Sequence, residues 1–181
     1  MKRFILKYGL LSGIISSGLM IASLPLEDRI GSSYILGYTV LVASFLLVYF
    51  GVRSYRERVG AGAITFGRAF AVGISITLIS CIFYVVTWEI TYFNFMPDFM
   101  DKYSAHEVQK IKASGASPAK IQAQLASIEK TRQMYNNVLY NSAITFMEPF
   151  PVGLIITLVS AAVLRRKALA EPTPDRAVMT T

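Results

Sequence analysis

The sequence is poor in charged residues and in the residue types that build most enzyme sites. Only 16% of its 181 residues are charged, whereas soluble domains carry about 25%. It has one cysteine, Cys81, and one histidine, His106, which excludes an internal disulfide and a site with several cysteine ligands. Cys81 lies among apolar residues and is interpreted as a packing residue. Gly60-Ala61-Gly62 lacks the further glycine and the lysine of a phosphate-binding loop.

What the sequence has instead is four long apolar segments, and 54% of all residues are hydrophobic. The segments run from about Phe4 to Leu26, Tyr34 to Val52, Ala69 to Trp88 and Ser142 to Leu164. A helix needs about 20 residues to cross a bilayer. Uninterrupted runs of this length exclude a β-barrel. The first run is long for a signal peptide and has no A-x-A cleavage pattern. The sequence therefore predicts an all-α integral membrane protein with a four-helix bundle.

Basic residues predict the orientation of the four helices. If the N-terminus is cytoplasmic, eleven basic residues and three acids fall on the cytoplasmic side, and the formal net charge of +7 is concentrated there. This placement predicts contact with anionic lipid headgroups and no nucleic-acid binding. We expect a multi-pass inner-membrane protein with both termini in the cytoplasm. Residues 1–167 form the predicted membrane domain, and residues 168–181 a disordered cytoplasmic tail.

The one sizeable polar stretch, residues 89–141, predicts an extracytoplasmic helical hairpin between the third and fourth membrane helices. Ser104-Ala105-His106-Glu107 matches a capping box and predicts the start of its first helix, with Gly115 ending that helix. Ser117-Pro118 predicts the start of a second helix, which we expect to continue into the fourth segment. The second helix has an apolar face. We favour packing of this face against the first arm, and the alternative is a surface for a protein partner.

Glycine and other small residues recur every four positions in two of the apolar segments. The rows are Gly9, Gly13 and Ser17 in the first segment and Gly153, Thr157 and Ala161 in the fourth. Such rows allow helices to approach closely. We favour packing within the bundle over contact between copies of the chain.

Glu148, Pro149 and Pro151 interrupt the fourth segment. Because proline has no N–H group, we expect either a break in the helix here or water and neighbouring polar groups that reach this depth. At a rise of about 1.5 Å per residue, Glu148 lies about 25 Å, and Glu89 about 31 Å, above the basic ends of their helices. Both carboxylates are therefore expected near the outer boundary of the membrane.

Two interpretations of Glu148 stay open. In the first, its side chain caps the helix that begins at Pro149, where the helix dipole favours negative charge. In the second, Glu148 lies in a polar, partly hydrated pocket at the outer end of the bundle, with Glu89, Trp88 and Tyr92 near its rim.

Several short stretches occur together in a characteristic order along the chain. They are Lys7-Tyr8-Gly9, Gly51-Val52-Arg53-Ser54-Tyr55-Arg56, Ile64-Thr65-Phe66-Gly67-Arg68-Ala69-Phe70, Tyr84-Val85-Val86-Thr87-Trp88-Glu89, Phe146-Met147-Glu148-Pro149-Phe150-Pro151-Val152-Gly153 and Arg165-Arg166-Lys167. With this set the chain, up to about Lys167, resembles a bacterial membrane family catalogued only as a domain of unknown function, number forty-one ninety-nine. The resemblance implies a bacterial four-helix inner-membrane protein and implies no activity.

Function is the least determined property. No nucleophile with a neighbouring base is visible, and we predict no catalytic, cofactor-binding or metal-binding residue and no enzyme activity. We expect a non-enzymatic accessory or interaction component of the membrane, with a protein partner bound through the outer insert. The alternative is a small oligomeric transporter or channel that uses Glu148 and Glu89. An enzyme acting on lipid headgroups is a third hypothesis.

Overall fold

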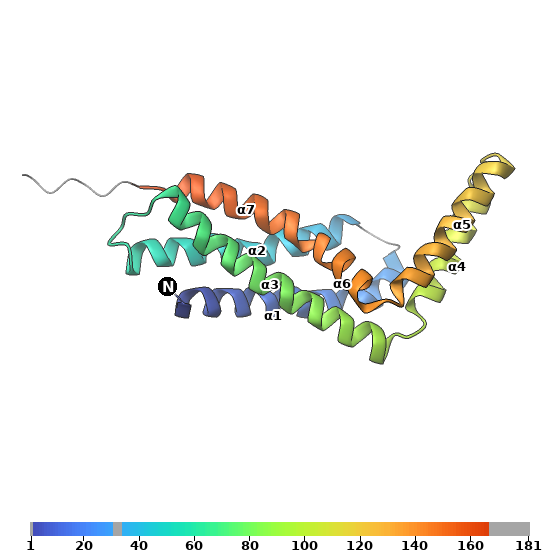
Figure 1. Ribbon diagram of the computed structural model, residues 1–181, viewed down its shortest axis with the longest axis horizontal. Coiled ribbons are helices and arrows are strands. Elements are labelled where there is room, and N and C mark those ends of the chain that lie inside the picture. Colours follow the sequence, from blue (N-terminus) through green and yellow to red (C-terminus); the bar gives the residue numbers. More distant parts are fainter. Residues whose placement is uncertain (1, 31–33, 167–181) are drawn as a thin grey trace, which may run out of the picture.

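The computed structural model describes residues 2–30 and 34–166, and every regular element within them is an α-helix (Figure 1). In chain order these are α1 (Lys2–Ile30), α2 (Tyr34–Arg58), α3 (Phe66–Phe95), α4 (Phe99–Ala113), α5 (Pro118–Tyr135), α6 (Val138–Met147) and α7 (Pro149–Leu164). The all-α prediction is confirmed. The predicted cytoplasmic tail, residues 168–181, lies outside the described residues.

Helices α1, α2, α3 and α7 lie side by side and share one hydrophobic core (Figure 1). The most deeply buried apolar side chains of this core come from α2, α3 and α7, and α1 adds Met20. Cys81 is fully buried in the core, as its apolar sequence surroundings predicted. We call the end of this bundle near Lys2, Arg58 and Leu164 the basic end. The end next to α4 and α5 is called the hairpin end.

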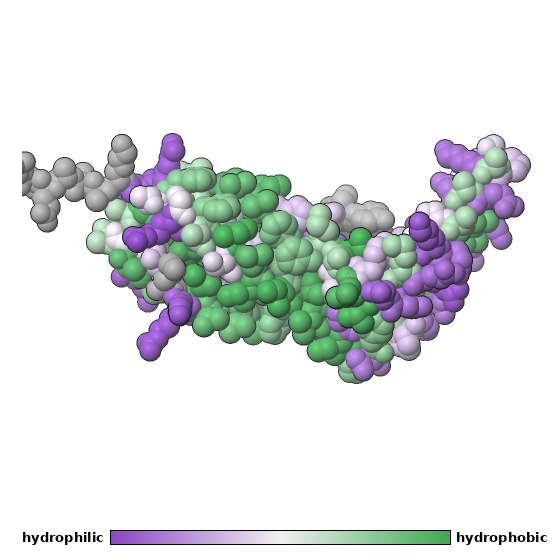
Figure 2. Space-filling view, in the orientation of Figure 1, coloured by the Kyte–Doolittle hydropathy of each residue, from purple (hydrophilic) through white to green (hydrophobic). Residues whose placement is uncertain are grey.

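Three helical stretches among the described residues are long and apolar enough to cross a membrane. They are Lys2–Leu24, Phe66–Phe95 and Val138–Leu164, the last made of α6 and α7 together. Figure 2 shows a continuous apolar surface over the visible face of the bundle, with polar residues at the basic end and over the hairpin. Large apolar side chains such as Ile82, Ile155 and Val163 are more than half exposed. A soluble monomer rarely exposes so large an apolar surface, and the protein therefore has the surface of a membrane protein.

Small residues allow the helices to pack closely inside the bundle. A Cβ atom added to Gly13 would lie 2.7 Å from Cβ of Phe83 on α3, and one added to Gly153 would lie 2.5 Å from Cγ2 of Thr77. Real Cβ atoms essentially never come so close to another side chain. These positions in the two small-residue rows therefore face α3 within the same chain, which is the interpretation favoured from the sequence.

Helices α4 and α5 form a hairpin that extends beyond the end of the bundle (Figure 1). Gly115 has a φ of +68° in the turn between them, a conformation that favours glycine. The second arm begins as predicted, because Ser117 is the N-cap and Pro118 the first residue of α5.

The two arms of the hairpin pack against each other along an apolar seam. Val108 of α4 and Leu125 and Ile128 of α5 line a groove of about 340 Å³ between the arms. An ion pair with an N···O distance of 2.6 Å joins Arg132 of α5 to Asp101 of α4. The apolar face of α5 is therefore directed at the other arm, as favoured from its sequence.

Two of the predicted boundaries in the hairpin are wrong. The capping-box prediction fails because α4 begins at Phe99, five residues before Ser104, which is buried within the helix. Met100, 5% exposed, shows that tertiary burial extends the helix upstream of the local signal. The predicted continuation of the second arm into the fourth segment also fails, because α5 ends at Tyr135. The side chain of Asn137 then accepts hydrogen bonds from the N–H groups of Leu139 and Tyr140 and starts α6 as a new helix.

Candidate functional site

Polar and aromatic side chains gather where α3 meets α6, at the hairpin end of the bundle. We call this set the hairpin-end cluster; its members are Tyr84, Trp88, Glu89, Tyr92, Tyr135, Asn141, Ser142, Thr145 and Glu148. It contains all four site residues predicted from the sequence. Trp88, Glu89 and Tyr92 come from α3, and Glu148 lies between α6 and α7.

Asn141 is the centre of the cluster and has no exposed surface. Its side-chain oxygen accepts hydrogen bonds from Nε1 of Trp88 at 2.9 Å and from Oγ1 of Thr145 at 3.2 Å. Its side-chain nitrogen donates to the carbonyl oxygen of Tyr135 at 3.4 Å. One amide thus connects α3, the end of α5 and the middle of α6, which fixes the base of the hairpin to the bundle.

Glu89 lies beside this network on the same helix as Trp88. Its Oε1 atom accepts a hydrogen bond from Oγ of Ser142 at 2.9 Å. Its Oε2 atom is buried and has no hydrogen-bond partner. A carboxyl group with one buried, unsatisfied oxygen is uncommon in folded proteins and calls for an explanation.

Glu148 lies at the opposite end of α6 from Ser142, about 9 Å away along the helix axis by its rise per residue. The predicted helix break is present, because α6 ends at Met147 and α7 begins at Pro149. Glu148 occupies the N-cap position of α7, but its side chain makes no cap hydrogen bond there; stabilisation of its charge by the dipole of α7 stays a prediction. The hydroxyl group of Tyr84 instead donates to Oε2 of Glu148 at 3.3 Å.

The backbone at the break is partly satisfied within α6. Because Pro149 has no N–H group, the carbonyl of Thr145 loses its usual helical partner. It accepts a hydrogen bond from the N–H group of Glu148 at 3.4 Å instead. The side chain of Glu148 is exposed at the surface of the bundle, so the two predicted carboxylates contact different partners. That these side chains enclose a hydrated pocket stays a prediction.

Aromatic rings connect the cluster to the hairpin. The ring of Trp88 packs edge-on against Phe99 at the start of α4, with centroids 5.2 Å apart. Tyr92 contacts Phe99 and also Tyr135, at 6.2 and 6.3 Å. Burial, and then the neighbouring carboxylate of Glu148, raise the pKa of the Tyr135 hydroxyl group to about 12. The hairpin is therefore held at its base by aromatic ring contacts and by Asn141 together.

Four members of this cluster, Glu89, Glu148, Trp88 and Tyr92, are predicted from the sequence. The members that the sequence does not predict are Tyr84, Tyr135, Asn141, Ser142 and Thr145. Asn141, Ser142 and Thr145 are neutral and lie at the start of the fourth apolar segment, where polar residues are expected simply because the membrane segment begins there. The one available signal was Asn141 itself, since a side-chain amide in a membrane segment requires hydrogen-bond partners. One of those partners, Trp88, lies on α3, which is remote in the sequence.

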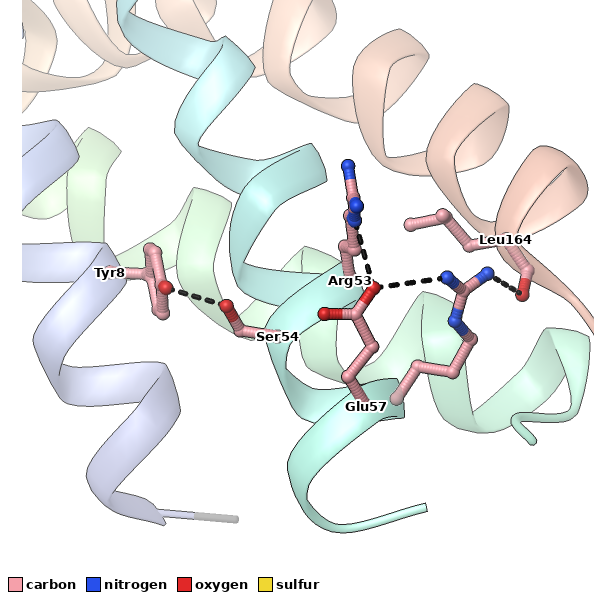
Figure 3. Close-up of polar contacts among 6 residues, drawn as sticks. Tyr8, Arg53, Ser54, Glu57 and Leu164 are labelled. Atoms are coloured by element: carbon pink, nitrogen blue, oxygen red, sulfur yellow. Dashed lines mark hydrogen bonds and ion pairs between the residues drawn. The ribbon is translucent and has the colours of Figure 1, made fainter. Parts of the chain in front are cut away.

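The basic end carries a second set of polar contacts, shown in Figure 3. The hydroxyl groups of Tyr8 and Ser54 lie 2.7 Å apart and join α1 to α2. Arg56 donates from Nη1 to the carbonyl oxygen of Leu164 at 3.4 Å and pairs through Nη2 with Glu57 at 3.3 Å. Leu164 ends α7, where carbonyl groups lack helical partners and a positive charge is favourable. These contacts give Tyr8, Ser54 and Arg56 structural roles at the basic end.

The chemistry available in the hairpin-end cluster is that of neutral hydrogen bonds and of two carboxyl groups, those of Glu89 and Glu148. No cluster of three or more metal-ligating side chains occurs among all the residues that the structure describes. The hairpin-end cluster can hold helices together and can take up a proton or another small cation at a carboxyl group.

Comparison with known proteins gives one match, to the model of a family described as "Protein of unknown function (DUF4199)", over residues 7–166. The resemblance seen in the ordered sequence motifs is thereby confirmed. No curated protein and no solved structure matches the chain.

Proposed function

The chain belongs to the DUF4199 family of proteins of unknown function, and we propose that it is a non-enzymatic component of the bacterial inner membrane. In this proposal four helices span the membrane, and the α4–α5 hairpin presents a binding surface to a protein partner on the outer side. Each part of the proposal is supported by a different feature of the structure.

The packing of α2 supports a fourth membrane span. This helix has 25 residues and packs against α1, α3 and α7. A helix packed among three others that cross the bilayer must lie at the same depth as they do. Its exposed side chains include Val42, Leu46 and Phe50, about half exposed, and these suit lipid tails.

The charge distribution supports the orientation. The basic end gathers the positively charged residues that flank the apolar helices, and positive charge near helix ends favours the cytoplasmic side. Anionic lipid headgroups on that side would attract the same residues. Both chain termini are then cytoplasmic, and the hairpin is on the other side of the membrane.

The observation that carries the interaction role is the hairpin's surface. No residue of α5 is buried, and α4 buries only Met100 and Ser104. The hairpin therefore adds little to the hydrophobic core, yet aromatic ring contacts and Asn141 fix its base to the bundle. A rigidly held, polar projection of this kind is suited to contact with another protein.

Site-specific photo-crosslinking in living cells tests this role. A photoreactive residue is placed at Gln122 or Ala126, both exposed on α5, and at Ile155 of α7, which is 61% exposed, as the matched control. Both hairpin positions should capture the same protein, identified by mass spectrometry, and Ile155 should not. The capture should disappear when residues 99–135 are replaced by a short flexible linker. The proposal fails if neither hairpin position gives an adduct, or if Ile155 gives the same one.

The unsatisfied oxygen of Glu89 favours a second candidate, a small oligomeric transporter or channel. The close contacts of Gly13 and Gly153 leave little space between α3 and its neighbours, so a pathway would have to lie between copies of the chain. Purified protein in liposomes should then carry protons or monovalent cations down a gradient, and Glu89→Gln should lower the flux. Absence of flux under every applied gradient excludes this candidate.

A further inference from the structure

We propose that Glu89 is a proton-binding site: its carboxyl group carries a proton at neutral pH, at the hairpin end of the apolar surface. This inference rests on the membrane placement of α3 proposed above and is independent of the hairpin's role. It concerns the state of one side chain and assigns a ligand, the proton, to the hairpin-end cluster.

The two carboxyl oxygens of Glu89 have different surroundings. Ser142 donates the one hydrogen bond that Glu89 receives, to Oε1. Oε2 is buried and has no donor near it. Among the side chains that the structure describes, Glu89 forms no ion pair with a lysine, arginine or histidine. An ionised carboxylate would leave a charged oxygen buried without compensation, which is far more costly than burial of the neutral acid.

The ionisable side chains around Glu89 are mostly acids. In the hairpin half of the bundle, the described side chains of the helices packed against α3, of α3 itself and of the adjacent start of α4 supply several acids and one base. The acids are Tyr38, Tyr84, Tyr92, Asp98, Asp101, Tyr103, Tyr140 and Glu148, and the base is Lys102. Between Tyr8 and Leu24, α1 has no ionisable residue, and neither has α7. Lys102 is exposed and pairs with Asp98 at 2.8 Å, and it forms no ion pair with Glu89. This set therefore offers Glu89 no positively charged partner, and any acid in it that ionises disfavours a negative charge on Glu89.

The apolar surface of α3 continues past Glu89 toward the hairpin. Val86 and Ile90, on the turns either side of Glu89, are about half exposed, and Phe95, six residues further on, is 75% exposed. The apolar surface thus continues about 9 Å beyond Glu89 toward the hairpin. Lipid covers such a surface, so the carboxyl group has little access to water. The aromatic rings of Trp88 and Tyr92 lie at the same level, as aromatic residues do near a membrane boundary.

A metal cation fits this position less well than a proton. A bound cation needs several oxygen ligands, and Glu89 has only Ser142 as a hydrogen-bonding neighbour. The side-chain oxygen of Asn141 is already occupied by Trp88 and Thr145. A proton requires one oxygen atom, and Oε2 is available.

Reaction with a hydrophobic carbodiimide, dicyclohexylcarbodiimide, tests the proposal directly, because this reagent adds to protonated carboxyl groups in apolar surroundings. The full-length protein in native membranes is treated at neutral pH, and modified residues are mapped by mass spectrometry. Glu89 should be modified in the wild type and in Glu148→Gln, the matched control, and the modification should be lost in Glu89→Gln. Modification of Glu89 only after acidification would show that it is ionised at neutral pH and overturn the proposal.

A water-soluble carbodiimide separates this claim from the membrane placement. If Glu89 reacts with the soluble reagent in place of the hydrophobic one, the membrane placement of α3 is wrong. If it reacts with neither, the proton assignment alone is wrong.

Trp88 provides a second readout, because it is the one tryptophan in the chain and adjoins Glu89. Its fluorescence in the wild type should change with pH at a midpoint above 7, and the same change should be absent in Glu89→Gln and present in Glu148→Gln. A midpoint near the ordinary glutamate pKa of about 4.3 would refute the proposal.

Discussion

Replacing Asn141 with leucine should destabilise the protein, because the side-chain amide of Asn141 makes three hydrogen bonds that leucine cannot make. The lost partners are Nε1 of Trp88, Oγ1 of Thr145 and the carbonyl oxygen of Tyr135. Hydrogen bonds between membrane helices are worth about 0.6 kcal/mol each on average. Only the bond to Trp88 joins two such helices, but a similar value for the bonds to Thr145 and Tyr135 gives a total loss of about 2 kcal/mol, or roughly a 30-fold change in the ratio of folded to unfolded protein.

The assay is reversible unfolding of the purified protein in mild detergent by increasing amounts of sodium dodecyl sulfate, followed by helical circular dichroism. Asn94→Leu is the matched control, because Asn94 also lies on a membrane helix but is exposed and bonds only to its own helix, at the carbonyl of Ile90. The control should stay within about 0.5 kcal/mol of the wild type, as expected of exposed substitutions.

A double-mutant cycle identifies the contact responsible. Trp88→Phe removes the donor, and the combined variant should be more stable than the sum of the two single effects predicts, because both changes remove the same hydrogen bond. If Asn141→Leu is as stable as the wild type, or if the two effects add independently, Asn141 does not hold α3 to α6 and our account of the hairpin's base is wrong.

Two further predictions concern packing and pH. Gly153→Ala should cost about 1–3 kcal/mol by overpacking against Thr77, whereas Gly18→Ala, at a position with open space, should be neutral or stabilising; equal effects in the same unfolding assay would contradict the packing. The hydroxyl group of Tyr135 should ionise near pH 12 in the folded protein and near pH 10 when unfolded. This raised pKa means that its contribution to stability is complete below pH 10 and is lost as the pH rises from 10 to 12. An ultraviolet titration of tyrosinate, compared with Tyr135→Phe, checks the value, and a transition near pH 10 would contradict it.

Much of the fold could be predicted from the sequence because its signals are local. The apolar runs identified the bundle helices, and Gly115, Ser117 and Pro118 located the turn of the hairpin. Pro149 predicted the break between α6 and α7 for the same reason, since the missing N–H group acts on its own helix.

The rest depends on contacts between residues far apart in the chain. The first arm of the hairpin starts at Phe99 and not at Ser104 because Phe99 packs on Trp88 of α3. The sequence did not predict the hydrogen bond that Glu148 accepts from Tyr84, because Tyr84 lies 64 residues away. Asn137 is a different case, since asparagine is a common N-cap and the break between α5 and α6 could have been predicted from it.

The central claim is that the basic end lies on the cytoplasmic side of the membrane and the hairpin on the outer side. Labelling with an impermeant thiol reagent tests this claim most directly. In a background in which Cys81 is replaced by alanine, single cysteines are placed at Ser114, in the hairpin turn, and at Arg58, at the basic end. Our account predicts that the reagent labels Ser114→Cys in intact spheroplasts and Arg58→Cys only after the membrane is permeabilised. Labelling of both positions in intact spheroplasts, or of neither, would show that α3 does not cross the membrane and would contradict the account.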